Sequence, residues 1–194
     1  MRRSASFTES FRELGLLVFI VIICGLVQVR NQGFLTLDNI NDLLTNTAIL
    51  SIMAVGMMMV ILTRGIDLSV GSIVAIAGMV SALTVQYFRG ISPVVSVLEA
   101  IAVGTVVGVL NGLLVARFNV LPIIATLGTM NVIRGLTYVI SGGAWVSSYQ
   151  MSSGFKQIAT GGILGVSNPI IFAVLINLLF FYFINHMRTG RQVY

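Results

Sequence analysis

The stretch Gly65-Ile66-Asp67-Leu68-Ser69-Val70-Gly71-Ser72 joins two long apolar runs, residues 48–62 and 70–85. It holds one acid, two hydroxyls and two glycines. Two interpretations remain open. The stretch is either a tight surface turn with Asp67 as the N-cap of the next helix, or an interruption at membrane depth, where backbone groups can meet a polar solute.

The composition is that of a membrane protein. Of the 194 residues, 57% are hydrophobic and 9% are charged, whereas soluble domains carry about 25% charged residues. The basic residues are scattered singly, which argues against nucleic-acid binding despite the net charge of +5. The single cysteine, Cys24, lies in an apolar run, so we expect no disulfide, no metal site and no cofactor.

Six apolar runs are long enough to cross a bilayer, because about twenty helical residues cover a hydrocarbon core of roughly 30 Å. They predict an all-α fold, a polytopic transmembrane helical bundle forming a single domain over residues 1–194. The polar break lies between the second and third spans, and the segment Asp38 to Asp42 offers N-caps for the second. The predicted spans are residues 14–29, 43–63, 69–88, 93–116, 120–140 and 169–185.

The fourth span carries small residues at every fourth position. Small side chains at this spacing form a groove in which a second helix can approach closely, so we expect this span to pack helices together. The residues are Ala100, Gly104, Gly108, Gly112 and Ala116.

Ionisable side chains also lie inside the predicted spans. Arg134 is in the fifth, where an arginine costs about 2.5 to 3.5 kcal/mol on insertion scales. It either faces protein or a wet cavity, or it reaches the outer interface, and the sequence does not decide between them. We expect Glu99, near the outer end of the fourth span, to be an interfacial carboxylate. The polar segment 141–167 carries aromatics and is expected to form a structured cover.

The basic residues of the connectors predict the orientation. With the N-terminus in the cytoplasm, the inside connectors hold seven basic residues and the outside connectors hold three, as the positive-inside rule requires. The inside residues are Arg2, Arg3, Arg12, Arg64, Arg117, Arg188 and Arg191, and the outside residues are Arg30, Arg89 and Lys156.

Several motifs together resemble those of the permease subunits of bacterial ATP-binding-cassette importers for ribose, arabinose, galactose or xylose. The resemblance extends from about Phe34 to the end of the sequence. The motifs, in order, are Ala54-Val55-Gly56-Met57, Val60-Ile61-Leu62-Thr63-Arg64 with the opening stretch, residues 108–116, Ala125-Thr126-Leu127-Gly128-Thr129, Arg134-Gly135 and Thr189-Gly190-Arg191.

The resemblance implies a multi-pass subunit in the cell membrane that forms half of a pathway for a monosaccharide or a related small polyol. It implies three partners: an extracytoplasmic sugar-binding protein, an ATPase subunit and a second permease subunit. Such permeases continue beyond a coupling loop that begins like Arg188, Thr189, Gly190 and Arg191, so we expect an N-terminal portion. Lys156 is not in a phosphate-binding motif, so ATP hydrolysis is expected on a separate subunit.

We expect the polar residues of the break and of the fifth span to border the translocation pathway or its gate. An ion-coupled secondary transporter, with Asp67 as the coupling carboxylate, is the alternative. Its uptake would collapse with the ion gradient and survive depletion of ATP. The expected pathway residues are Asp67, Ser69, Gly71, Ser72, Thr126, Asn131 and Arg134.

Overall fold

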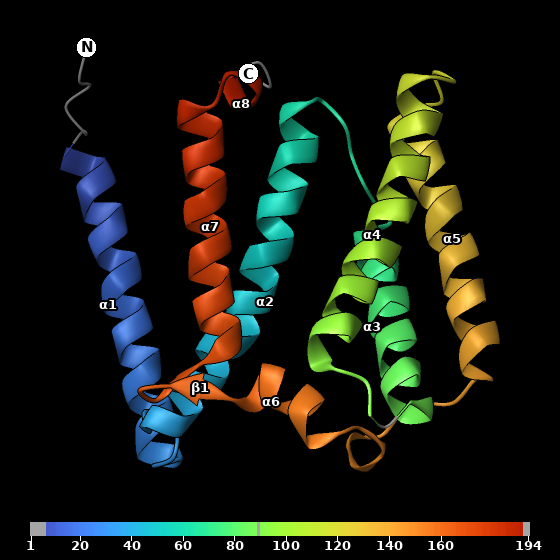
Figure 1. Cartoon of the computed structure of the whole chain (residues 1–194). Coiled ribbons are helices and arrows are strands. Elements are labelled where there is room, and N and C mark those ends of the chain that lie inside the picture. The colour runs from blue at the N-terminus through green and yellow to red at the C-terminus, as the bar shows by residue number, and fades with distance from the viewer. Residues whose placement is uncertain (1–6, 89, 192–194) are drawn as a thin grey trace. The chain divides into compact units, whose positions relative to one another are not determined.

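The structure is a computed structural model that describes residues 7–88 and 90–191 (Figure 1). Arg2, Arg3 and Arg89, which enter the orientation count, lie outside the described residues. Among the described residues, six helices are long and apolar enough to cross a membrane. This confirms the predicted all-α fold with six spans. Contacts divide the chain into two compact units, one ending at Asn46 and the other beginning at Thr47; the single domain stays a prediction.

The first unit holds α1 (Phe7–Arg30) and the first turns of α2 (Leu37–Leu62). The Thr36 hydroxyl accepts a hydrogen bond from the Asn39 amide at 3.4 Å and donates one to the Gly33 carbonyl at 2.8 Å. Thr36 therefore occupies the N-cap position of α2. The N-cap predicted between Asp38 and Asp42 is wrong, because the helix has already begun there.

The second unit continues α2 and adds α3 (Val70–Tyr87), α4 (Pro93–Ala116), α5 (Pro122–Ser141) and α7 (Asn168–His186). These four helices begin and end within two residues of the predicted spans. A proline lies at the first or second position of α4, α5 and α7. Proline suits this position because its fixed φ is helical and its missing amide would have had no intrahelical partner.

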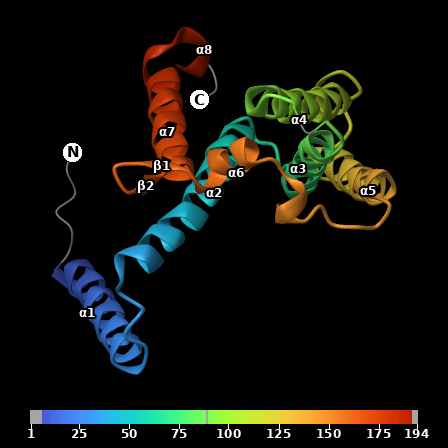
Figure 2. The ribbon, with the colours of Figure 1, turned by 60° about the horizontal axis from the view of Figure 1, so that its bottom comes forward.

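Helix α3 packs against both α4 and α5 (Figure 2). Their contact is apolar, with buried Ile76, Val107 and Ile133 at its centre. Many other large apolar side chains of these helices are exposed, among them Leu98 and Ile101 on α4. Exposed apolar side chains are what a helix needs where it faces lipid.

The polar segment between α5 and α7 is structured, as expected. It forms a 3-10 turn η1 (Ser148–Gln150), a short helix α6 (Ser153–Thr160) and an antiparallel hairpin of β1 (Gly162–Ile163) and β2 (Val166–Ser167). The Ser152 hydroxyl caps α6 by accepting from the Phe155 amide. Helix α8 (Arg188–Arg191) follows α7.

The small residues of α4 do not all face the same way. A four-residue spacing drifts by about 40° per step around a helix of 3.6 residues per turn. A Cβ at Gly104 would lie 3.5 Å from Ile73 of α3, whereas a Cβ at Gly108 or Gly112 would meet no described atom within 4 Å. Of these three glycines, Gly104 therefore lies against α3, and a packing role for the stripe as a whole stays a prediction.

We predict that Gly104→Leu destabilises the chain more than Gly112→Leu. Both changes replace a helical glycine, so their helix-propensity effects match. Only the first forces a large side chain against Ile73, and overpacking of this kind costs about 1 to 3 kcal/mol. Unfolding of the purified chain by titration with a denaturing detergent measures the difference. Equal destabilisation by the two changes would contradict the α3–α4 packing described above.

Candidate functional site

After the polar break, α3 begins deeper in the bundle than the end of α4 and the start of α5. The hydroxyl of Ser69, the N-cap of α3, accepts a hydrogen bond from the Asn111 side chain at 2.8 Å. Asn111 lies five residues before the end of α4, a distance of about 7 to 8 Å along the axis. Figure 1 shows the connector running from the end of α2 down to the start of α3. The connector is therefore not a tight turn, and Ser69, not Asp67, is the N-cap of α3; that the break lies at membrane depth stays a prediction.

Two backbone features at Arg64 and Gly65 end α2, and the connector begins after them. Arg64 adopts the left-handed conformation, with φ of 61°, and the Gly65 amide donates to the Val60 carbonyl at 3.0 Å. A Cβ at Gly65 would lie 3.1 Å from the Val60 side chain. Glycine suits this position because the chain folds closely back over the last turn of α2, and a larger residue would push against Val60.

Asp67 shapes the start of α3 without being its N-cap residue. Its carboxylate accepts hydrogen bonds from the Ser69 amide at 2.7 Å and from the Ser69 hydroxyl at 2.6 Å. This is the local turn that aspartate side chains form with the backbone two residues on. A negative charge at this place also favours the positive end of the helix dipole.

Hydrogen bonds join this turn to both neighbouring helices. The Asn111 amide donates to Ser69, and the Ser69 hydroxyl donates to Asp67. On the other side, Thr126 of α5 accepts from the Leu68 amide at 3.2 Å. The Ser72 hydroxyl donates to the Ser69 carbonyl at 2.7 Å. We call this set the polar node: Asp67, Ser69, Ser72, Asn111 and Thr126.

The polar node is almost wholly buried. Ser69 is 0% exposed, Ser72 2%, Thr126 4% and Asn111 6%, while Asp67 is half-buried. Buried polar groups are tolerated when their hydrogen bonds are made. The node therefore ties α3, α4 and α5 together at one depth.

Asn111 is the member of the node that the sequence interpretation missed. Its one signal is that it places a primary amide in a span that is otherwise almost entirely apolar. Its side-chain oxygen is buried and has no hydrogen-bond partner among the described residues. The Asn111 side chain is thus held only through its nitrogen, which donates to Ser69.

The expected pathway residues do not form one site. The node holds Asp67, Ser69, Ser72 and Thr126, and Gly71 is exposed beside it. The exposed Asn131 side chain donates to the Leu127 carbonyl of its own helix at 2.9 Å. Arg134 lies eight residues beyond Thr126 along α5, about 12 Å away. It lines a separate cleft between α3 and α5.

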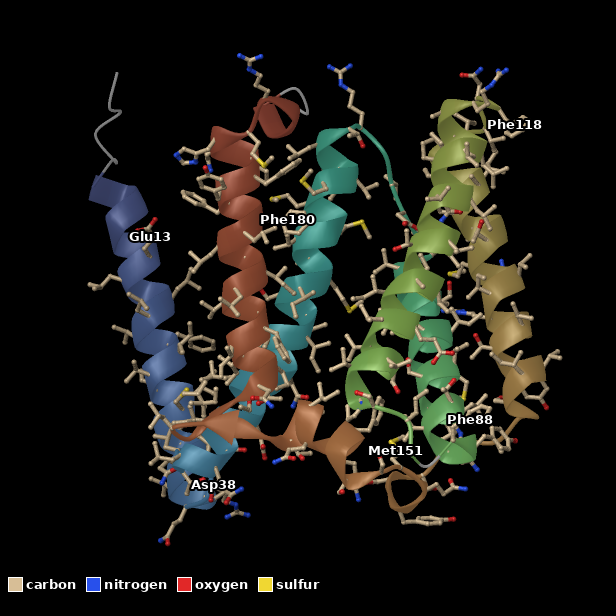
Figure 3. The ribbon with its side chains drawn as sticks, viewed as in Figure 1. Glu13, Asp38, Phe88, Phe118, Met151 and Phe180 are labelled. Atoms are coloured by element: carbon tan, nitrogen blue, oxygen red, sulfur yellow. The ribbon has the colours of Figure 1, made fainter. Side chains whose placement is uncertain are left out.

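The polar node and the Arg134 cleft lie toward opposite ends of α5. Figure 3 shows Phe118 at one end of α4, with Phe88 and Met151 at the other end of the unit. The node is near the Phe118 end, because Asn111 and Thr126 flank the connector between α4 and α5. The cleft extends to residues 143–146, near the opposite end.

Glu99 forms part of a second polar contact between α3 and α4. Its carboxylate accepts from the Thr84 hydroxyl at 2.9 Å, and its other oxygen is buried without a partner among the described residues. Nearby, the Ser81 hydroxyl donates to the Ser96 carbonyl at 2.8 Å. Glu99 thus turns toward α3, and its place at the membrane interface stays a prediction.

The residues expected to couple to an ATPase form α8, which packs on α7. Gly190 is buried, and a Cβ there would collide with the Phe183 carbonyl. Arg188 is exposed, whereas the side chains of Thr189 and Arg191 lie outside the described part. A coupling role for these four residues stays a prediction. No group of His, Cys, Asp and Glu suited to a metal occurs among the described residues.

Comparison with known proteins gives a family match over most of the chain. The family described as branched-chain amino acid transport system / permease component matches residues 39–194. The ribose import permease protein of Escherichia coli K12 is 36% identical over 180 residues, which are 92% of this chain and 56% of that protein. The D-allose transport system permease protein of the same strain is 33% identical over 98% of this chain and 57% of its own length.

A galactose/methyl galactoside import permease protein of Haemophilus influenzae is 31% identical over the whole chain and 62% of its own length. The chain thus spans a little over half the length of these relatives. No solved structure gives a significant match.

We predict that Ser69 and Asn111 are energetically coupled. Ser69→Ala leaves the buried Asn111 amide without its acceptor, a loss of about 1 to 3 kcal/mol. In the double variant with Asn111→Leu, the unpaired amide is gone, so the double variant should be less destabilised than the sum of the two single variants. A double-mutant cycle on unfolding free energies measures this coupling.

Thr105→Val serves as the control partner. Thr105 lies on α4, as Asn111 does, but it is exposed and its hydroxyl donates only to the Ile101 carbonyl. Its effect should simply add to that of Ser69→Ala. Additive effects in both cycles would mean that the Ser69–Asn111 hydrogen bond contributes nothing to stability.

Proposed function

The chain belongs to the branched-chain amino acid transport system / permease component family, and from this premise we propose that it forms part of the membrane pathway of an ATP-driven importer for a monosaccharide or a related small polyol. The observation that carries the proposal is the match to sugar import permeases over more than nine-tenths of the chain. Neutral sugars are recognised through their hydroxyl groups, so such a pathway needs polar side chains and no metal.

Within this pathway, the polar node braces the inner gate. Its members are too deeply buried to present a sugar-binding wall, apart from the half-buried Asp67. Their hydrogen bonds instead fix where α3 begins relative to α4 and α5. A gate built on the start of α3 therefore depends on the Asp67–Ser69 turn.

The partners follow from the same premise. An ATPase subunit would contact the chain at α8, in the cytoplasm, and a sugar-binding protein would dock at the segment 142–167 on the opposite side. A second permease subunit would complete the pathway. The excess of basic residues in the N-terminal, α2–α3, α4–α5 and α8 connectors supports a cytoplasmic N-terminus in the cell membrane.

Asp67→Asn should lower ATP-dependent sugar uptake several-fold in the complete transporter. Asparagine keeps the shape of the turn but replaces a charged acceptor by a neutral one, and charge-assisted hydrogen bonds are roughly twice as strong as neutral ones. Uptake of labelled ribose, normalised to the amount of subunit in the membrane, measures the effect.

Asp42→Asn is the matched control, because Asp42 is an exposed acid in the first turns of α2. It should leave uptake unchanged. If Asp67→Asn inserts normally and transports like the unmodified subunit, the node has no part in the gate.

The energy source tests the function itself. Uptake should stop when ATP is depleted and continue when an uncoupler dissipates the ion gradients while ATP is maintained. The opposite pattern would establish an ion-coupled secondary transporter. This measurement needs no variant, so its outcome is independent of the role given to Asp67.

A further inference from the structure

A cleft of about 540 Å³ lies between α3 and α5, away from the polar node. On the α3 side its floor is apolar and includes the small residues Ala75, Gly78 and Ala82. On the α5 side it is lined by Arg134, Tyr138 and Ser141. These three residues follow one another at helical spacing, so polar groups rise along one edge of an apolar groove.

Two glycines form the turn that leads from α5 to one end of this cleft. Gly142 and Gly143 both adopt left-handed conformations, with φ of 61° and 73°, and the Gly143 amide donates to the Tyr138 carbonyl at 3.0 Å. A Cβ at Gly143 would lie 3.1 Å from the Tyr138 ring. The chain therefore folds back over Tyr138 and carries Trp145 to the mouth of the cleft.

Arg134 is a cation without a counterion in this cleft. Its side chain is exposed, and it makes no ion pair with any acid that the structure describes. It lies seven residues before the end of α5, about 10 Å along the axis. A charge at this depth is costly unless it meets an opposite charge or extends toward the headgroups.

We propose that this cleft binds one anionic phospholipid from the leaflet on the side of the 142–167 segment. The phosphate pairs with the Arg134 guanidinium, whose planar fork matches two phosphate oxygens. The acyl chains lie along the apolar floor on α3. Tyr138 and Trp145 flank the headgroup, at the level where such aromatics are enriched in membrane proteins. The site is independent of the sugar route and assigns Arg134 to lipid.

Shape and chemistry favour a lipid over other occupants. A neutral sugar needs several convergent polar groups, whereas most of this cleft is apolar. Residues 143–146 line the end of the cleft that follows α5, which shortens the stretch of α3 and α5 on which another helix could pack. A lipid enters sideways and meets neither restriction.

The chain offers a direct reporter, because Trp145 is its only tryptophan. The full chain is placed in phosphatidylcholine nanodiscs with brominated phosphatidylglycerol or brominated phosphatidylcholine at equal mole fraction. The brominated phosphatidylglycerol should quench Trp145 several-fold more strongly. In Arg134→Gln the two lipids should quench equally, while Arg134→Lys, which keeps the charge, should retain part of the preference.

Arg117→Gln is the control, because Arg117 is an exposed arginine at the C-terminal end of α4 and does not line the cleft. It should keep the full preference for phosphatidylglycerol. Equal quenching by both lipids in the unmodified chain would overturn the proposal, and this comparison holds even if Arg134→Gln fails to fold.

Two further outcomes would also overturn it. One is a change in Trp145 fluorescence on adding ribose that depends on Arg134, which would make the cleft a sugar site. The other is protection of Trp145 from both lipids that increases with self-association, which would make the cleft a contact between copies of the chain.

Discussion

The chain of hydrogen bonds from Asn111 through Ser69 to Asp67 is the constraint on which the second unit depends. A helix that begins inside a bundle exposes its first amides and the preceding irregular backbone to apolar surroundings. Each unpaired polar group there costs several kcal/mol. The node supplies partners from two neighbouring helices and from the chain itself, so α3 can begin where it does.

A short α3 follows from this arrangement. Its 18 residues span about 27 Å, whereas the 24 residues of α4 span about 36 Å. The difference is filled by the connector after α2, whose backbone is held by side chains and not by a helix. The apolar centre at Ile76, Val107 and Ile133 lies about one to two turns from the node along each helix. The cleft at Arg134 runs beside this centre, from Val74 to Ala82 on α3.

Much of this fold could be predicted from the sequence, because run length and hydropathy are nearly sufficient to define a span. The prolines at the starts of α4, α5 and α7 fixed those starts closely. The start of α2 was missed because the Thr36 hydroxyl, two residues before Asp38, reaches its first turn. Asn111 was missed because a single amide in an apolar span does not reveal its partner, Ser69, which lies 42 residues earlier at the start of α3.

The grouping of Thr126 with Arg134 shows what a sequence pattern leaves undetermined. Both are polar residues of one apolar span, and residue type alone assigns them to one pathway. Eight residues separate them, which is about 12 Å along the helix and about 80° around it. Thr126 therefore meets the connector beside α3, and Arg134 meets an open apolar cleft. In a membrane bundle, depth and rotation decide which polar residues share a site, and both depend on the neighbouring helices.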